Sequence, residues 1–282
     1  SIVSEQNEMG RQEEYLIIAG QQRLTTVSLL FLAMYDLIDE CGKDLESVGY
    51  TVKKLEKFGI STGILNVEDE ESDMREGEYF ILNCPRLYDY GIDCHAFISE
   101  NLSEHLKKFM KNLRLRHKDK VLIVCLGNPD IAADRLGKEV FDNITIDVLN
   151  KANNIYKFCP NIFFSTGIET VDMVEMLVKC MYIDYCIIID SLTTNNPKRL
   201  GCSFQITTSG MTPGSGVARF SRRIDQDTMG VPCLSIGVPF MIFASDLNEN
   251  SPQDLVLAPK DIRENVAIAG GIIANAISEV LK

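Results

Sequence analysis

Two uninterrupted apolar runs in the middle of the chain predict strands at the centre of a sheet. The first, Val121–Leu126 (VLIVCL), is rich in β-branched residues and has no polar alternation, which is typical of a strand buried on both faces. The second, Tyr185–Ile189 (YCIII), has the same character. Shorter runs predict further strands at residues 77–85, Asn161–Ser165, Phe204–Ile206 and Pro232–Ile236.

Amphipathic segments alternate with these runs. Residues Ser99–Leu113 carry their apolar side chains at helical spacing, which predicts a helix with one buried face. Further helices are expected at Leu136–Asn143, Glu169–Cys180 and 261–282. Strands that alternate with helices indicate an α/β fold, a three-layer sandwich with a mainly parallel sheet.

The first 76 residues follow a different pattern. Residues 1–12 are polar and predict a frayed end, and Leu16–Gly20 (LIIAG) reads as a short strand. A helix is expected from Thr25 or Thr26 to Gly42, and the acidic stretch Val67–Gly77 predicts a solvated loop. We therefore expect an N-terminal appendage over 1–45, an acidic connecting segment over 46–76, and the main domain over 77–282.

Composition narrows the function classes. The chain has 282 residues, 45% of them hydrophobic, and its 28 lysines and arginines against 40 acidic residues give a net charge of −12. This charge argues against non-specific binding of nucleic acid, because such binding depends on cations that neutralise phosphates. We therefore expect no nucleic-acid partner.

Cysteine and histidine usage predicts neither a metal nor a cofactor. None of the nine cysteines forms a C-x-x-C pair, and the three histidines, His95, His105 and His117, share one stretch. Scattered cysteines inside apolar runs are typical of reduced core thiols in a cytoplasmic protein. The apolar run Val27–Met34 is too short to span a bilayer, so no membrane partner is expected.

Candidate chemistry lies where the apolar strands end, because open parallel sheets bind ligands outside the carboxyl ends of their strands. Asp134 lies in the loop after Val121–Leu126, with Asp130 in the same loop, and Asp190 directly follows Tyr185–Ile189. Two carboxyls brought together in this way can share a proton, so that one activates water while the other polarises a carbonyl. The alternative is structural, since an aspartate after a strand often caps the next helix.

A glycine-rich loop follows the run Phe204–Ile206. Its residues Gly214, Ser215 and Gly216 offer backbone N–H groups that suit an oxyanion or another anion, although the same pattern also fits a simple tight loop. The loop has no lysine of the phosphate-binding type, and the chain has no G-x-G-x-x-G motif, which argues against nucleotide binding.

Six segments, taken in order, resemble the germination protease (spore endopeptidase) family. They span roughly Gly77 to the C-terminus and read LIVCLGNPDIAADRLG, STGIETVDMVEMLVK, YCIIIDSLTT, FQITTSGMTPGSGV, TMGVPCLSIGVP and LAPKDIRENVAIAGGIIANAI. The resemblance implies an aspartic-type endopeptidase, made as a zymogen, that degrades small acid-soluble spore proteins in the spore core. It also implies a homo-oligomer, a tetramer, and a fold similar to that of the hydrogenase maturation endopeptidases.

The catalytic aspartates of that family map onto two residues already singled out. Asp134 lies in A-A-D-R-L-G and Asp190 in I-D-S-L, which match the two family motifs. The chain departs from the family at Thr208, Thr212 and Arg219 in the glycine-rich segment, and it has Arg135 where alanine is usual.

These departures keep two alternatives open. A cation beside Asp134 would lower its pKa and work against proton sharing, which favours a catalytically silent binding or assembly protein on the same fold. A nickel-dependent maturation-type endopeptidase is the other alternative, although Thr212 stands where a histidine would help to bind the metal. The C-terminal stretch AIAGGIIANAI fits a helix–helix seam either within one chain or between copies.

The N-terminal stretch EYLIIAGQQRLTTVSLLFLAMYDLI shows a second resemblance. It is similar to the D-G-Q-Q-R-L-T-T segment of ParB-like, GmrSD-type restriction endonucleases, with Ala19 in place of the motif aspartate. About 25 residues match, and we interpret them as a structural remnant that packs as a strand and a helix.

Overall fold

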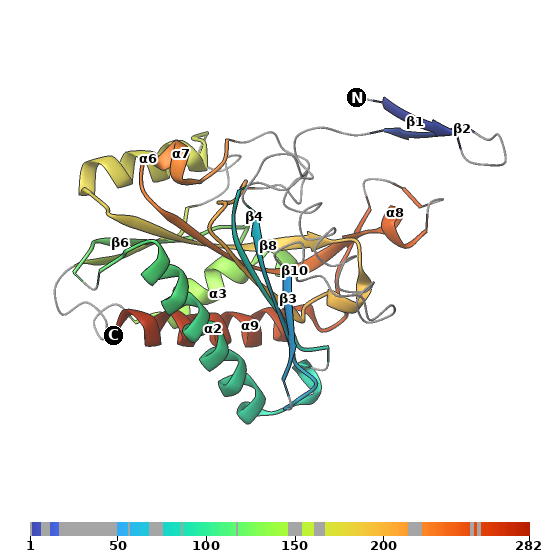
Figure 1. Ribbon diagram of the computed structural model, residues 1–282, viewed down its shortest axis with the longest axis horizontal. Helices are drawn as coiled ribbons and strands as arrows, with labels where there is room; N and C mark the ends of the chain where they lie inside the picture. Colours follow the sequence, from blue (N-terminus) through green and yellow to red (C-terminus); the bar gives the residue numbers. More distant parts are fainter. Residues whose placement is uncertain are drawn as a thin grey trace.

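The computed structural model describes twelve stretches of the chain. They are residues 2–6, 12–16, 50–55, 57–67, 76–85, 87–116, 118–145, 154–160, 167–213, 222–248, 251–252 and 255–282. Figure 1 shows them as coloured ribbons, with the remaining residues as a thin grey trace.

One large mixed sheet organises the molecule. Its strands lie in the order β3-β4-β5-β9-β10-β8-β6-β7, with β11 paired to β10, while β1 and β2 form a separate two-stranded sheet. The strands are β1 Ile2–Gln6, β2 Gln12–Leu16, β3 Tyr50–Lys54, β4 Ser61–Val67, β5 Gly77–Asn83, β6 Val121–Cys125, β7 Ile155–Phe158, β8 Tyr185–Thr194, β9 Ser203–Thr207, β10 Cys233–Phe243 and β11 Val256–Leu257.

The half of the sheet that carries the candidate chemistry is parallel. Strands β7, β6, β8 and β10 pair side by side in the same direction, whereas β9, β5, β4 and β3 continue the sheet as antiparallel strands. All residues of β6 and β8 are buried, as their uninterrupted apolar runs predict. The predicted α/β class with a parallel central sheet is confirmed, and the antiparallel strands extend it.

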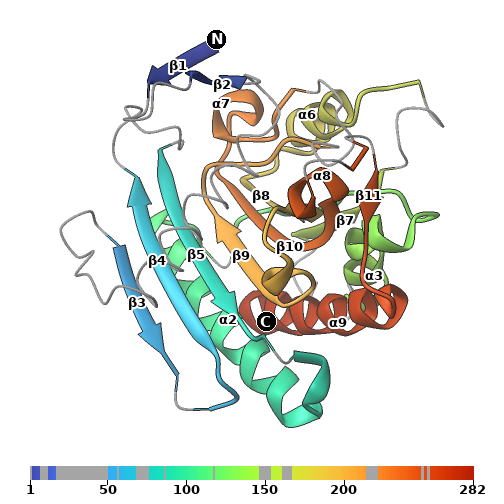
Figure 2. The same cartoon turned by 90° about the vertical axis from the view of Figure 1, so that its right-hand side faces the viewer.

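Helices cover both faces of the sheet, which gives three layers (Figure 2). Apolar residues of α2, α3 and α9 pack with one face of the sheet in the larger core cluster, and those of α6 and α7 pack with the other face in a second cluster. The helices are α2 Ile92–Asn112, α3 Leu136–Asn143, α6 Thr170–Met181, α7 Gln226–Met229, α8 Ala244–Leu247 and α9 Ile262–Leu281, with short 3₁₀ turns η2 Leu87–Asp89, η3 Ala132–Asp134 and η4 Pro197–Arg199.

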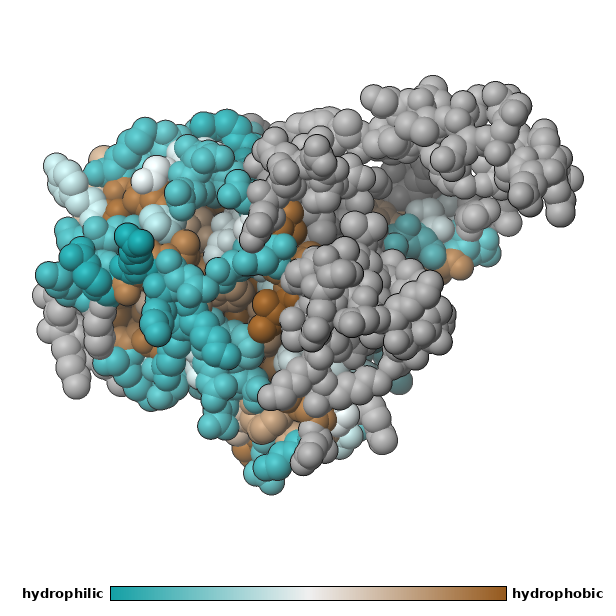
Figure 3. Space-filling view, viewed as in Figure 1, coloured by the Kyte–Doolittle hydropathy of each residue, from teal (hydrophilic) through white to brown (hydrophobic). Residues whose placement is uncertain are grey.

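Successive residues of β8 supply the two cores alternately. Ile187 belongs to the cluster under α2, α3 and α9, and Ile188 belongs to the cluster under α6 and α7. In the view of Figure 3 the described surface is mostly hydrophilic, and hydrophobic colour shows mainly in the recesses between polar side chains. The apolar runs of the sequence therefore supply side chains to both core layers.

Most predicted elements of the main domain are confirmed. Helix α3 has the predicted bounds, Leu136–Asn143, and α2 includes the predicted amphipathic segment but begins earlier, at Ile92. Strand β8 runs on to Thr194, past the polar residues after Ile189, because β10 pairs with it from Cys186 to Thr194. Strand β7 was not predicted, since its sequence IYKF has a single buried residue.

The sheet begins earlier in the chain than the expected boundary at residue 77. Strands β3 and β4 lie within 46–76, the segment expected to be an acidic connection, and β4 pairs with β5 over seven residues. The sequence of β4, STGILNV, has no regular alternation, since Ser61, Thr62 and Gly63 are buried while Ile64 is exposed, so the strand is not evident beside the acidic run. Residues 1–12, expected to be frayed, contribute β1 and the start of β2.

Several predictions fall outside the described residues. They concern the strand at Leu16–Gly20 beyond its first residue, the helix from Thr25 or Thr26 to Gly42, most of the acidic loop Val67–Gly77 and the strand Asn161–Ser165. The segment resembling the restriction endonucleases lies almost wholly in this group.

Helix α9 packs inside the molecule. A Cβ on Gly270 would lie 2.6 Å from Cβ of Glu139 in α3, so its glycine permits close contact between the two helices. The small-residue stretch thus forms a seam within one chain. Among the described helices α9 alone has the length and hydropathy that a membrane span requires, and 56% of its apolar window is buried in the fold, as is typical of a core helix.

Candidate active site

Asp190 lies beside the end of a central strand. Cys125, the last residue of β6, pairs with Ile189 of β8, so Asp190 is the first residue of β8 beyond the end of β6. On its other side it pairs with Gly237 of β10. The side chain is 4% exposed, and its Oδ1 accepts a hydrogen bond from the backbone N–H of Ser191 at 2.9 Å.

Asp134 reaches the same region from the loop after β6. It is the last residue of η3, and its Oδ2 accepts a hydrogen bond of 2.8 Å from the backbone N–H of Asn128. Helix α3 begins at Leu136 with Arg135 as its N-cap and has no side-chain cap bond. The alternative role of Asp134 as a helix cap is therefore wrong, and Asp190 does not precede a helix either, since it lies within β8.

Two glycines allow the loop to fold back onto the end of β6. Gly127 has φ of +106°, and a Cβ there would lie 2.0 Å from the carbonyl oxygen of Asp134. A Cβ on Gly137 would lie 2.1 Å from the carbonyl oxygen of Leu126, so this glycine lets α3 approach the strand end. The two glycines bracket the loop that carries Asp134, but the sequence alone does not indicate the close backbone approach that each of them allows.

The two carboxyl groups influence each other's ionisation. Burial raises the pKa of Asp134 from its ordinary value of 3.8 to about 6, opposed by the hydrogen bond from Asn128. Burial also raises the pKa of Asp190 well above its ordinary value, and the charge of Asp134 raises it further. The structure thus brings together the two aspartates that the sequence analysis singled out.

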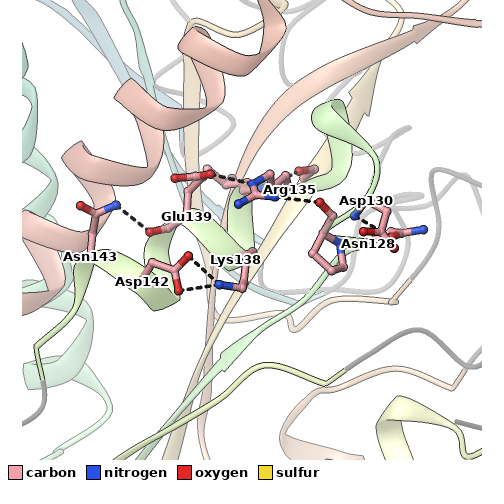
Figure 4. Close-up of polar contacts among 10 residues, drawn as sticks. Asn128, Asp130, Arg135, Lys138, Glu139, Asp142 and Asn143 are labelled. Carbon is pink, nitrogen blue, oxygen red and sulfur yellow. Dashed lines mark hydrogen bonds and ion pairs between the residues drawn. The ribbon is translucent and has the colours of Figure 1, made fainter. Parts of the chain in front are cut away.

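Arg135 points away from Asp134, which corrects an expectation from the sequence. Its Nε donates to Oε1 of Glu139 at 2.7 Å, and its Nη1 donates to the carbonyl of Pro129 at 3.0 Å (Figure 4). The pKa of Asp134 is raised, not lowered, and Arg135 is not among the causes of that shift. One of the two grounds for a catalytically silent protein, the cation beside Asp134, is thereby removed, and the altered glycine-rich segment is the other.

A further cation holds the base of the glycine-rich loop. Arg223 donates to the carbonyl of Ser209 at 2.7 Å and to the hydroxyl of Thr212 at 3.5 Å, and it pairs with Asp225 at 3.2 Å. The sequence does not single out this residue, because it lies after the loop. It comes close to the residues before the loop only because Met211 pairs with Ile224. Gly214, Ser215 and Gly216 lie outside the described residues.

A cleft of 470 Å³ opens beside the loop of Asp134. It is lined by residues from three elements: Pro129, Asp130, Ala132, Arg135, Glu139, Arg263 and Val266. Asp130 is exposed there, in contrast to the half-buried Asp134 and the buried Asp190. Within the described ranges no three histidine, cysteine, aspartate or glutamate side chains gather as metal ligands would.

The histidines of α2 belong to a different part of the molecule. The ring of His105 stacks on Phe80 of β5 with centroids 3.7 Å apart, and its Nδ1 is 2.8 Å from the carbonyl oxygen of Asn101. Neither contact involves the aspartate pair. His117 lies outside the described residues.

A three-layer α/β sandwich with two interacting carboxyls, one buried and one half-buried, at the end of a central parallel strand defines the class: an α/β protein with a candidate acid–base centre. Within that class the chain belongs to the germination protease family, whose model matches residues 35–258. The family is a peptidase family.

Curated relatives bear the same name. The chain is 27% identical over 219 residues to the germination protease of Priestia megaterium, covering 73% of this chain and 59% of that protein. It is 28% identical over 212 residues to the germination protease of Bacillus subtilis, covering 71% of this chain and 58% of that protein. It is 28% identical over 244 residues to the one of Caldanaerobacter subterraneus, covering 80% of this chain and 74% of that protein. The chain thus spans less than two thirds of the length of the first two relatives.

Four chains among the solved structures also match. One of them is a [NiFe] hydrogenase maturation protease from Thermococcus kodakarensis, 16% identical, with a TM-score of 0.37 over 58% of this chain and 92% of that one. A likeness to a hydrogenase maturation protease, as expected from the sequence, is therefore found.

Proposed function

We propose that this chain is an endopeptidase of the germination protease type, in which Asp134 and Asp190 form an aspartic acid–base pair. The observation that carries the proposal is the interaction of two carboxyl groups at the end of β6, the half-buried Asp134 and the buried Asp190, with the pKa of both raised. Pairs of titratable groups whose environments separate their pKa values are the usual acid and base of such sites.

We assign the roles from the directions of the two pKa shifts. Asp134, whose pKa is raised to about 6, acts as the base once it is ionised, and Asp190, whose pKa is raised by burial and by the charge of Asp134, holds the shared proton. The Asp134 carboxylate takes a proton from water, the resulting hydroxide attacks the peptide carbonyl, and the Asp190 proton passes to the carbonyl oxygen. Asp134 then gives its proton to the nitrogen of the departing amine, and as the C–N bond breaks one hydroxyl of the gem-diol intermediate returns its proton to Asp190, which restores both carboxyls.

The remaining parts of the proposal come from the family. We propose small acid-soluble spore proteins as substrates in the spore core, a zymogen as the form in which the protein is made, and a homo-oligomer, a tetramer, as its assembled state. The glycine-rich loop with Gly214, Ser215 and Gly216 would supply N–H donors for the carbonyl oxygen. Light scattering at micromolar concentration tests the assembly, and a monomer would contradict it.

Replacement of either aspartate tests the mechanism. Asp134→Asn and Asp190→Asn keep the shape of the side chain but cannot exchange a proton, so each is expected to lower the cleavage rate of a purified small acid-soluble spore protein by about 10²–10⁴-fold. Because the pair acts as a unit, the double variant should be scarcely slower than either single variant. The measurement is the rate of product formation by mass spectrometry.

Asp130→Asn is the matched control, because Asp130 lies in the same loop but is exposed. It is expected to keep most of the activity. The wild-type rate should rise with pH through about 6, as Asp134 ionises. Full activity in Asp134→Asn or Asp190→Asn would end the paired-aspartate mechanism.

A further inference from the structure

Two thiols contact each other where β5 leads into α2. Cys84 directly follows β5 and Cys94 is the third residue of α2, and their Sγ atoms are 3.9 Å apart. Both residues are thiols, and both are fully buried in the larger core cluster. The strand and the helix that carry them are seen in Figure 2. A disulfide holds its sulfur atoms about 2.05 Å apart, so the two atoms need to approach by only roughly 2 Å to form one.

The backbone on both sides of Cys84 fixes its position. Its N–H donates to the carbonyl oxygen of Cys202 at 2.9 Å, which continues the pairing of β5 with β9. Its own carbonyl oxygen accepts a hydrogen bond of 3.0 Å from the N–H of Leu87. Cys84 is therefore the fixed member of the pair, and the approach of the two sulfur atoms depends on Cys94.

The first turn of α2, which carries Cys94, is weakly held. Its N-cap is Gly91, which makes no side-chain cap bond, so the turn lacks the stabilisation that serine or aspartate supplies there. Ile92, the first helical residue, is 83% exposed and adds little packing. Helix ends with few buried contacts open locally at a low cost in free energy. Opening of this turn exposes Cys94 to solvent while the core stays folded.

Burial controls the reactivity of Cys94. In the closed turn burial raises the pKa of this thiol, opposed by the hydrogen bond with Cys84, so little of it is thiolate. The thiolate is the form that reacts in disulfide exchange, and a position near a helix N-terminus favours it once burial is relieved. The closed turn thus protects the thiol, and the open turn makes it reactive.

We propose that Cys84 and Cys94 form a redox-sensitive pair, which a low-molecular-weight disulfide converts into an intramolecular disulfide between β5 and α2. The Cys94 thiolate attacks one sulfur of the oxidant, forms a mixed disulfide and releases one small thiol, which takes up the Cys94 proton. The Cys84 sulfur then attacks the Cys94 sulfur and releases the second small thiol, which takes up the Cys84 proton. Two protein thiols are oxidised and one small disulfide is reduced to two thiols, so atoms and electrons balance.

The bond would join the start of α2 to the sheet and stabilise the fold. It closes the loop 84–94, which restricts the unfolded chain. The pair is separate from the proposed peptidase centre, because Asp190 on β8 aligns through Gly237 and Gln205 with Ile81 of β5. Three strand spacings of about 4.8 Å place Asp190 roughly 14 Å from β5. This proposal and the paired-aspartate mechanism can therefore fail separately.

Incubation of the full chain with oxidised glutathione, followed by peptide mass mapping, tests the proposal. Arg86 lies between the two cysteines in the sequence, so trypsin places them on different peptides, which only a disulfide joins. We expect the Cys84–Cys94 link as the main product, reversed by dithiothreitol. The linked protein should have a Tm roughly 5–10 °C above that of the reduced protein. Cys94→Ala is expected to lose both the link and the rise in Tm.

Cys202→Ala is the matched control. Cys202 is also buried and adjoins Cys84, but its Sγ donates to the carbonyl oxygen of Lys198 at 3.1 Å. This variant should form the Cys84–Cys94 link like the wild type.

Gly91→Asp tests whether the first turn must open. Gly91 has an extended backbone with φ of −88°, and a Cβ there meets nothing within 4 Å, so an aspartate fits and caps the turn. The cap and its charge at the helix N-terminus should slow formation of the link about two- to fivefold.

Four results would overturn the proposal. The first is that no link forms in the native protein under conditions in which glutathione modifies the exposed Cys180. The second is a preferred link between Cys186 and Cys233, which pair on β8 and β10. The third is a linked protein that is no more stable than the reduced one. The fourth is an equal rate of linking in Gly91→Asp and the wild type, which would show that Cys94 does not react through opening of its turn.

Discussion

Replacing Asp134 by asparagine is expected to make the protein more stable at neutral pH. The pKa of this carboxyl is raised on folding from 3.8 to about 6, mainly because burial penalises its charged form. A group of this kind contributes its full stability below the unfolded pKa, and the contribution is lost as pH rises through the folded pKa. Asparagine has no charge to bury, and its amide oxygen can still accept the hydrogen bond from Asn128.

The magnitude follows from the pKa change. A rise from 3.8 to about 6 corresponds, at about 1.36 kcal/mol per pKa unit, to ~3 kcal/mol lost between about pH 4 and pH 7. This is an upper limit, because the two carboxyls share the effect. For a chain of this size, ~3 kcal/mol corresponds to a rise in Tm of roughly 6–12 °C. The gain should be small near pH 4 and vanish below about pH 3, where the wild-type carboxyl is neutral in both states.

Thermal unfolding followed by circular dichroism between about pH 4 and pH 8 measures this difference. Asp130→Asn serves as the control and is expected to follow the wild type, since Asp130 is exposed. The reasoning would be refuted if Asp134→Asn were no more stable than the wild type at about pH 7.5, or if it were equally stabilised at about pH 4. Either result would show that burial does not penalise the charged form of Asp134, which is the electrostatic basis of the pair.

Two further substitutions probe the loop that carries Asp134. Gly127→Ala should lower the free energy of unfolding by more than about 2 kcal/mol, because the φ of Gly127 is +106° and the added Cβ would meet the Asp134 carbonyl. Urea titration measures this change, and an unchanged unfolding midpoint would contradict the geometry. Arg135→Ala removes a partly exposed ion pair with Glu139, so stability should fall by no more than about 1 kcal/mol and the pH profile of peptide cleavage should stay in place. A shift of that profile to higher pH would instead show that Arg135 lowers the pKa of Asp134.

The sequence by itself predicted the parallel core and singled out the two aspartates as candidates for the site. Uninterrupted apolar runs with flanking helical periodicity suffice to predict β6, the first half of β8 and α3, because strands buried on both faces tolerate no polar alternation. An acid that directly follows such a run, as Asp190 does, or lies in the loop after it, as Asp134 does, is a candidate for chemistry at that edge of the sheet. For Asp134 and Asp190 this local rule and the family motifs point to the same residues.

The early strands and the length of β8 required the tertiary structure. Strand β4 is a half-polar sequence that becomes a strand because β5 pairs with it, and β8 continues past Ile189 because β10 lies alongside. Strand propensity depends on such partners, and a single sequence does not contain them.

Only the tertiary structure decided the electrostatics of the site. From the sequence, Arg135 next to Asp134 indicates a lowered pKa, but the chain turns so that Arg135 faces Glu139 while Asp134 is buried near Asp190. Sequence neighbours at the start of a helix point in different directions, so adjacency along the chain says little about which charges meet. Burial and the approach of residues 56 positions apart set the pKa values, and both exist only once the sheet has formed.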